Sequence, residues 1–244
     1  MTENTILITG AGGGIGAALC EILTASGHRV AAVSRDATRL DAVNAELKIE
    51  ADCTTPEGVA SMFAQAQESF GETPAGLAHC VGNTLLTPLH RTRAEAWSDV
   101  IRVNLDSAFH TLHGWISGRQ RLGGSAVVVS SVVAQIGVAN HEAIAAAKGG
   151  LEALVRSAAA SYAAQNLRFN AVAPGLTETP LTAPLLKSDA FRTAATKQYP
   201  LGGLQSAEDV AGVMAWLLGP GAARVTGQII PVDGGFTTIR PLVK

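Results

Sequence analysis

Short apolar runs alternate along this chain with longer segments in which apolar residues recur every three or four positions. The short runs are typical of buried strands, and the longer segments of helices that cover a sheet. Strands are predicted at 5–8, 28–34, 47–51, 75–81, 125–131, 167–173 and 228–232, and helices at 17–23, 36–46, 56–70, 93–105, 107–119, 141–164 and 206–218. This alternation predicts an α/β protein with one doubly wound parallel sheet of about seven strands and helices on both faces.

The helix boundaries and the domain organisation follow from the same pattern. Thr54 or Thr55, followed by Pro56, opens the helix that Gly71 closes, and Asn140 is expected to cap the helix 141–164. We expect residues 1–244 to form a single dinucleotide-binding domain. The segment 176–200 has no clean period and carries three prolines, so we expect it to be a substrate loop or lid.

A glycine-rich turn separates the first predicted strand from the first predicted helix. Residues 9–16 read TGAGGGIG, and such a turn needs residues without a Cβ because the backbone bends sharply and approaches a ligand closely. The following helix presents free N–H groups and the positive end of its dipole, which favour a phosphate. The alternative is a simple tight turn. We predict a Rossmann-type dinucleotide site that includes Gly10, Gly12, Gly14, Ile15 and Gly16.

Residues at the ends of the second and third predicted strands bear on the choice of cofactor. Ser34 and Arg35 stand where a carboxylate would hold the ribose hydroxyls of NAD. An arginine there pairs with a 2′-phosphate, which favours NADP(H) over NAD(H); alternatively, Arg35 stacks on adenine or faces solvent. Asp52 either reaches the adenine amino group or serves as an N-cap or turn residue.

Composition and charge narrow the classes of function. The net charge is −2 without a basic block, which argues against nucleic acid as the main partner. No run reaches the roughly 18 apolar residues of a membrane span, and the first residues lack a basic n-region, so we expect no membrane association and no signal peptide. Cys20, Cys53 and Cys80 are scattered, which is typical of reduced thiols in a cytoplasmic protein. The histidines lack metal-ligand spacing, so no metal is expected.

With these residues in place, the chain resembles the short-chain dehydrogenases/reductases, of the kind that includes 3-oxoacyl-carrier-protein reductases. The resemblance covers nearly the whole chain and implies a nicotinamide cofactor. It is carried by the glycine turn, Asp52, Asn104, Ser131, Lys148, Pro174, Gly175, Thr179 and the run Val232, Asp233, Gly234, Gly235. It implies catalytic roles for Asn104, Ser131 and Lys148, and cofactor contacts from Gly82, Lys148, Pro174, Gly175, Thr177 and Thr179.

The most serious departure from the family pattern lies four residues before Lys148. The family's Tyr-x-x-x-Lys reads Ile144 to Lys148 here, so the phenol whose pKa the lysine lowers is missing. Tyr199 would enter the site only if the segment 176–200 folds over it. His141, two helical turns before Lys148, is either a replacement acid/base or an exposed histidine of the first helical turn.

Two further departures suggest a remodelled pocket. The family's Asn-Asn-Ala-Gly appears as His79-Cys80-Val81-Gly82, and Thr177 replaces the usual isoleucine or valine.

We therefore expect an atypical NADP-dependent oxidoreductase that transfers hydride to or from a carbonyl or alcohol. The alternative is a nucleotide-binding protein without redox turnover, such as a sensor or partner subunit. Leu85, Leu86 and the segment 181–186 hint at an apolar small-molecule substrate, and the Ala-rich helix 142–164 favours a homo-oligomer, a tetramer or dimer.

Overall fold

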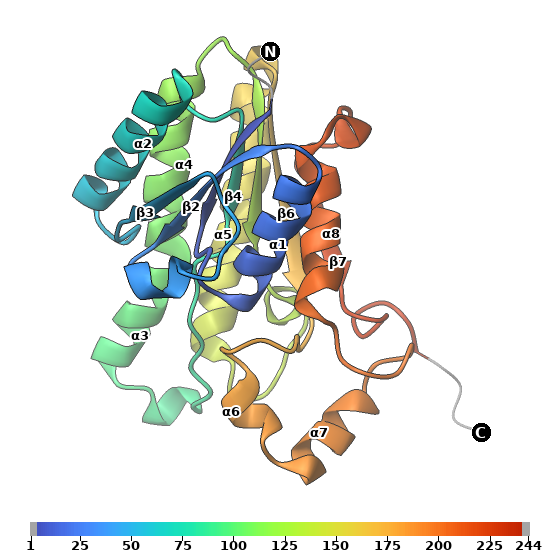
Figure 1. The fold of residues 1–244 in the computed structure, drawn as a ribbon. Coiled ribbons are helices and arrows are strands. Elements are labelled where there is room, and N and C mark those ends of the chain that lie inside the picture. Colours follow the sequence, from blue (N-terminus) through green and yellow to red (C-terminus); the bar gives the residue numbers. More distant parts are fainter. Residues whose placement is uncertain (1–3, 241–244) are drawn as a thin grey trace.

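The computed structural model describes residues 4–240 and contains one seven-stranded parallel sheet with the order β3-β2-β1-β4-β5-β6-β7 (Figure 1). The predicted doubly wound parallel sheet is thus confirmed. The strands are β1 Thr5–Thr9, β2 Arg29–Ser34, β3 Leu47–Glu50, β4 Gly76–His79, β5 Gly124–Val129, β6 Leu167–Pro174 and β7 Ile229–Val232. The helices are α1 Gly14–Ala25, α2 Pro56–Phe70, α3 Ala94–Ile101, α4 Ser107–Arg119, α5 Glu142–Tyr162, α6 Ala183–Leu186, α7 Asp189–Thr196 and α8 Ala207–Leu218.

Two apolar layers hold helices on opposite faces of this sheet. On one face, Leu7 and Leu77 of the central strands pack in a cluster with residues of α2, α4 and α5; on the other, Ile6 and Ile8 pack with residues of α1 and α8 (Figure 1). Trp115 of α4 is fully buried, and its indole N–H donates to the Pro74 carbonyl at 2.8 Å. Strands covered on both faces explain the continuous apolar runs in the sequence.

Several helices begin or end at residues whose local chemistry is typical of helix caps. Thr55 is the residue that caps α2, since its hydroxyl accepts from the Gly58 N–H, and Gly71 ends that helix in the left-handed conformation with φ of 86°. Ser206 and Asp209 form a capping box at the start of α8. These interactions are local, so the sequence alone contains them.

Two of the predicted helices are wrong in whole or in part. The segment 36–46 forms only a 3₁₀ turn over Ala37–Leu40, and Leu40 and Val43 are buried in the apolar cluster that includes residues of α1. The Lys48 ammonium binds the Asp41 carbonyl, which a helix 36–46 would use for its own hydrogen bonding.

The start of α5 also differs from the prediction. Asn140 has a left-handed φ of 65° and does not cap α5; His141 occupies the N-cap position, without a side-chain cap hydrogen bond, and the helix begins at Glu142. His141 therefore precedes the helix on which Lys148 lies.

Two segments near the carboxyl edge of the sheet have a different structure from the one that their sequences predict. Between α3 and α4, the residues Arg102–Asp106 form a π-helical turn, which is a feature frequent at functional sites. The segment 176–200, expected to be an irregular loop, contains α6 and α7 (Figure 1). The Ser188 hydroxyl caps α7, and Arg192 of that helix pairs with Glu178.

Candidate active site

Two adjoining cavities lie at the carboxyl ends of the strands. One has a volume of about 200 Å³ and the other of about 380 Å³, and residues 80–83, directly after β4, border both. The strand order reverses between β1 and β4, and ligands of doubly wound sheets bind at this switch point. The fold therefore places the candidate site where the topology predicts it.

The glycine turn after β1 is packed so closely that side chains are excluded. A Cβ on Gly10, whose φ is 69°, would lie 2.7 Å from the Cys80 carbonyl carbon, and one on Gly16 would lie 2.4 Å from the Gly10 oxygen. A Cβ on Gly14 would lie 2.8 Å from the Thr179 methyl group. Gly13 caps α1 without a side-chain hydrogen bond, and the first turn of α1 holds no acidic residue. This cradle fits a pyrophosphate.

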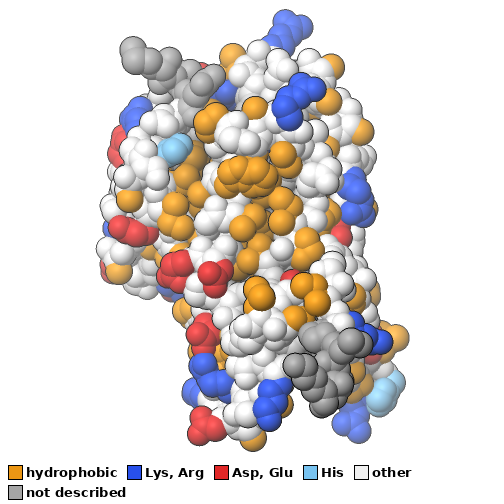
Figure 2. All heavy atoms as spheres, turned by 90° about the vertical axis from the view of Figure 1, so that its right-hand side faces the viewer, with side chains coloured by type: hydrophobic (Ala, Val, Ile, Leu, Met, Phe, Trp, Pro, Cys, Tyr) orange, Lys and Arg blue, Asp and Glu red, His pale blue; other side chains and the backbone are white. Residues whose placement is uncertain are grey.

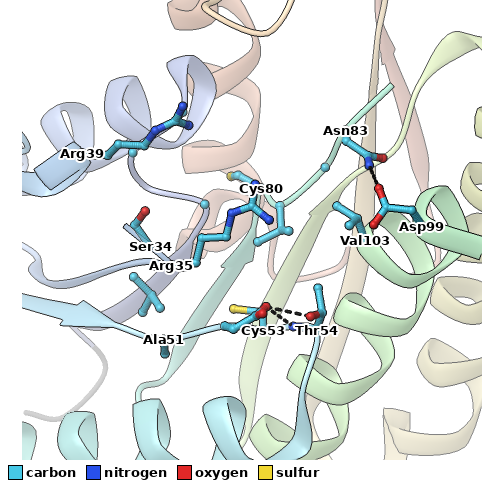
Figure 3. A pocket seen from close by; sticks show the side chains of 17 residues that line it. Ser34, Arg35, Arg39, Ala51, Cys53, Thr54, Cys80, Asn83, Asp99 and Val103 are labelled. Carbon is cyan, nitrogen blue, oxygen red and sulfur yellow. Dashed lines mark hydrogen bonds between the residues drawn. The ribbon is translucent and has the colours of Figure 1, made fainter. Parts of the chain in front are cut away.

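The smaller cavity carries two guanidinium groups near the end of β2. Figure 3 shows Arg35 extending from the end of β2 across the cavity, and Arg39 on the turn that follows. The Ser34 hydroxyl accepts from the Asp36 N–H at 3.2 Å, while Arg39 lies 3.7 Å from the Asp36 carboxylate. Sequence reasoning missed Arg39; the signal was a second arginine in the segment that connects β2 to β3.

Asp52 lies in the same cavity and forms a turn. Its Oδ1 accepts from the Thr54 N–H at 2.9 Å and from the Thr54 hydroxyl at 2.8 Å. Burial alone would raise the pKa of this carboxyl, but the two Thr54 hydrogen bonds and the nearby arginines hold it below its usual value. Asp52 is therefore a turn residue rather than an N-cap, and its carboxylate borders the cavity.

The larger cavity brings together the side chains that the sequence singled out. Ser131, Lys148, Asn104, His141 and Ile144 all line it. Lys148 is buried and its Nζ donates to the Val129 carbonyl at 2.7 Å. Burial lowers the pKa of Lys148 to about 8, with the nearby Cys80 thiol acting in the opposite direction. The Ser131 hydroxyl accepts from the Val133 N–H at 3.4 Å, which leaves its proton for donation.

Ile144 and His141 form the wall of this cavity next to Lys148. Ile144 is only 5% exposed and packs with Val100, Ala143 and Ala147. The His141 Nδ1 lies 2.7 Å from the Ala139 carbonyl oxygen, to which a protonated Nδ1 donates. In the neutral ring, Nε2 is then the acceptor.

His79 does not line either cavity, which corrects its inclusion in a remodelled pocket. Its ring is buried between two hydroxyls, with Thr9 Oγ1 at 2.8 Å from Nδ1 and Ser107 Oγ at 3.1 Å from Nε2. Burial, and secondarily the Lys148 charge, lower the pKa of His79 to about 3, so the ring is neutral. Cys80 and Thr177, by contrast, do border the larger cavity.

The segment after β6 closes the far side of the larger cavity. Pro174, Gly175, Thr177 and Thr179 line it, as does Tyr199. The Tyr199 hydroxyl accepts from the Leu176 N–H at 2.6 Å, and burial raises the pKa of its phenol. The segment 176–200 thus folds over the cavity and brings Tyr199 to its wall.

Residues 4–240 contain no group of three or more His, Cys, Asp and Glu side chains placed to hold a metal ion. Within the same part of the chain, every helix is too short or too polar to cross a membrane.

A parallel sheet with a glycine turn and a serine–lysine cavity at its carboxyl edge is an architecture of nucleotide-dependent oxidoreductases. A family model described as enoyl-(acyl carrier protein) reductase matches residues 10–237. The chain belongs to the short-chain dehydrogenase/reductase family of oxidoreductases, as its motifs indicated.

Relatives and solved structures match over nearly the whole chain. The chain is 36% identical to cis-4-hydroxycyclohexanecarboxylate dehydrogenase of Sinomonas cyclohexanicum, over 97% of this chain and 98% of that protein. It is 33% identical to a 3-oxoacyl-[acyl-carrier-protein] reductase of Pseudomonas aeruginosa, over 94% and 96%. Levodione reductase has a TM-score of 0.91 at 29% identity, covering 98% of this chain and 100% of its own.

Proposed function

We propose that this protein binds NADP(H) and transfers a hydride between the nicotinamide and a carbonyl or alcohol group of a small, neutral, apolar substrate. The proposal rests chiefly on the pair of adjoining cavities, one bordered by Arg35 and Arg39 and the other by Ser131 and Lys148. When bound, the nicotinamide supplies the hydride chemistry. The residues of the chain bind and orient the two reactants and exchange the proton.

The smaller cavity is suited to the 2′-phosphate that distinguishes NADP(H). Arg35 and Arg39 supply two guanidinium groups for charge-assisted hydrogen bonds. Two carboxylates lie close to them. Asp52 accepts two hydrogen bonds from Thr54. Asp36 accepts from the Thr38 hydroxyl at 2.6 Å and from the Thr38 N–H at 3.1 Å. These bonds, followed by the two arginine charges, keep its pKa low and its charge compensated.

In the larger cavity, Ser131 donates a hydrogen bond to the substrate oxygen and so polarises a carbonyl. Lys148 binds the nicotinamide ribose, and its lowered pKa of about 8 brings its proton exchange near neutral pH. Ile144 has no proton to exchange at the position one helical turn before Lys148. The proton therefore moves through water at Lys148 or through His141, whose ring borders the cavity.

The lining of the larger cavity supports an apolar substrate. Lys148 is the only Lys, Arg, Asp or Glu among its described lining residues. A carboxylate or phosphate of the substrate would therefore find no arginine and no second lysine there. Apolar side chains dominate the remainder of the wall: Leu86, Val133, Val138, Ile144, Leu176, Leu181, Leu185, Phe191 and Phe236.

The segment 176–200 acts in this proposal as the lid of a single domain that spans residues 1–244. Its residues Leu181, Leu185, Phe191 and Tyr199 border the cavity, so its closure excludes water from the reacting groups. The relative from Sinomonas cyclohexanicum acts, by its name, on a hydroxylated cyclohexane ring that bears a carboxylate. We propose a substrate of similar size without the carboxylate.

The second candidate function is nucleotide binding without redox turnover, which the apolar Ile144 beside Lys148 favours. Fluorescence titration with NADPH and NADH, followed by a broad screen of ketones and alcohols, separates the two functions. We expect NADPH binding and turnover of apolar substrates, with Ser131→Ala losing turnover but retaining NADPH affinity. Binding without turnover across the screen would support the second function, and failure to bind either nucleotide would contradict both.

A further inference from the structure

A buried carboxylate on α5 has no part in the proposed hydride and proton transfer. Glu152 is 5% exposed and lies one helical turn after Lys148, on the same face of the helix. A carboxylate is costly to bury unless its oxygens are hydrogen-bonded. Its Oε1 accepts from the Ser130 hydroxyl at 2.9 Å and from the Gln135 side-chain amide at 3.2 Å. One oxygen of Glu152 thus binds two side chains of the segment between β5 and α5.

These two donors stand at the two ends of the turn that carries Ser131, and residues 130–135 are called the serine turn below. The Ser130 N–H donates to the Val172 carbonyl at 2.7 Å, which holds the start of the turn to β6. Backbone hydrogen bonds inside the turn set its own shape. None of these backbone bonds reaches α5. The Glu152 carboxylate, by contrast, joins both ends of the serine turn to that helix.

The serine turn also touches α5 through an apolar side chain. Val133 packs with Ala143, Ile144 and Ala147 of that helix. Apolar contact is non-directional, so it keeps the turn close to α5 without fixing its orientation. Hydrogen bonds to a carboxylate have a preferred geometry and are stronger than those to neutral acceptors. The bonds of Glu152 are therefore the contacts suited to hold the serine turn in one orientation on the helix.

The Glu152 carboxylate also makes two consecutive serines different. Ser130 and Ser131 both border the larger cavity. A hydroxyl carries one proton, and that of Ser130 is donated to Glu152. The Ser131 hydroxyl accepts from the Val133 N–H and keeps its proton for another acceptor. Of the two serines, Ser131 is therefore the one that presents a proton to a substrate oxygen.

We propose that Glu152 is a positioning residue, which holds the serine turn to α5 so that Ser131 presents its proton at a fixed position relative to Lys148. The same helix already holds the end of β5, because Lys148 Nζ donates to the Val129 carbonyl directly before the turn. Glu152 borders neither cavity, so it acts through the turn and not on a ligand. This proposal rests on the proposed function for the importance of Ser131.

The first test is hydrogen–deuterium exchange, read by mass spectrometry, on the full-length protein without nucleotide. Glu152→Leu removes the acceptor at similar volume, and we expect the amides of the serine turn to exchange about tenfold faster, a usual size for the loss of hydrogen bonds to a charged group. Glu152→Gln keeps a carbonyl oxygen and should exchange like the wild type. Arg156→Gln is the matched control, because the Arg156 side chain is 55% exposed and lies 3.8 Å from the other Glu152 oxygen.

Gln135→Ala keeps this test decisive if Glu152→Leu does not fold. Gln135 is an exposed residue, so we expect a folded variant in which the serine turn exchanges faster, by a smaller factor. Wild-type exchange of the serine turn in Gln135→Ala and in a folded Glu152→Leu would overturn the proposal. Fast exchange in Glu152→Gln would also overturn it, as would an equal rise throughout β5 and α5, which indicates a purely structural role.

The second test compares turnover with nucleotide affinity. We expect Glu152→Leu to bind NADPH like the wild type in fluorescence titrations. Turnover of the best ketone or alcohol from the screen should fall by about ten- to a hundredfold, because a misplacement of about 1 Å costs up to that much. Glu152→Gln should restore turnover, and unchanged turnover in Glu152→Leu would overturn the proposal. A wild-type protein without turnover would contradict the proposed function, while the exchange measurement still decides whether Glu152 holds the serine turn.

Discussion

At the scale of single residues, the fold changes the chemistry of side chains that are ordinary in the sequence. Lys148 is moved out of water, which lowers its pKa to about 8, and His79 becomes a neutral core residue with a pKa of about 3. Burial likewise raises the pKa of the Cys80 thiol beside the cavity, so this cysteine is an unreactive thiol and not a nucleophile. Among these three groups, Lys148 is therefore the one suited to proton exchange near neutral pH.

Arg35 is predicted to distinguish the two nicotinamide cofactors. Arg35→Ala should weaken NADPH binding and leave NADH binding nearly unchanged, because only NADPH carries the 2′-phosphate. One charge-assisted phosphate contact contributes about 1.5–3 kcal/mol, which corresponds to a ten- to more than hundredfold loss of affinity. Fluorescence titrations with both cofactors measure this loss of affinity. Arg224→Ala is the control, since Arg224 is exposed and outside both cavities. Equal losses for both cofactors would contradict the assignment.

At the scale of elements, the first turn of α1 and the first half of α5 both border the larger cavity. Ile15 enters this cavity from α1, while Ile144 and Lys148 enter it from α5. The separation of four residues places the two α5 side chains one above the other on the same helix face. A substitution at one of these positions in either helix therefore changes the volume or lining of the same cavity.

The glycine turn is predicted to tolerate no side chain at Gly14. In Gly14→Val, the new side chain collides with Thr179, whose methyl group already lies 2.8 Å from a built Cβ, and projects toward the pyrophosphate site. We expect loss of NADPH binding together with poor yield of folded protein, measured by titration and circular dichroism. Gly212→Ala on α8, where a Cβ meets open space, should behave as wild type. A folded Gly14→Val protein with full NADPH affinity would place the cofactor elsewhere.

Ile144 is predicted to belong to a pocket rebuilt for a different substrate. Ile144→Tyr should fill cavity volume next to Val133 and Leu85 without creating ketone reductase activity. Ile144→Val, which keeps the apolar wall, should retain the native activity. Steady-state assays on simple ketones measure both. Activity in Ile144→Tyr at the level of ordinary family members would show that the site is an ordinary one that has lost a single group.

At the scale of the whole molecule, two of the helices, α4 and α8, carry exposed aromatic side chains. Figure 2 shows apolar side chains gathered on the side of the molecule that carries α8, where Trp216 is 47% exposed. On α4, Phe109 is 50% exposed and lies against the rings of His110 and His113. Exposed apolar groups of this size are typical of contact surfaces.

We expect the chain to form a homodimer or homotetramer. The Ala-rich sequence of α5 favours contact through this helix, and α4 packs in the same apolar cluster. Phe109→Glu on α4 should therefore lower the molar mass measured by light scattering after gel filtration. Trp216→Glu tests the α8 face in the same way. Leu89→Glu is the control, because Leu89 is 60% exposed and belongs to neither helix. A monomeric wild-type protein would contradict the expectation.

Much of the fold was predictable because its signals are local. Apolar runs mark the seven strands, Thr55 and Gly71 carry the ends of α2 in their own side-chain and backbone chemistry, and the glycine turn identifies the start of α1. These features depend on neighbours within a few residues, which the sequence contains. Ser131 and Lys148 were instead identified from the resemblance of the chain to the short-chain dehydrogenases/reductases.

Only the tertiary structure decided the features that join distant parts of the chain. The segment 36–46 contains a 3₁₀ turn in place of the predicted helix, with Leu40 buried in the cluster that includes α1 residues and Arg39 bordering the smaller cavity. His79 turned out to be a core residue because Thr9 and Ser107 meet it from two other elements. The sequence by itself thus determined which elements form and which groups are available. Their burial and partners, and with them the pKa of Lys148, depend on contacts that exist only after folding.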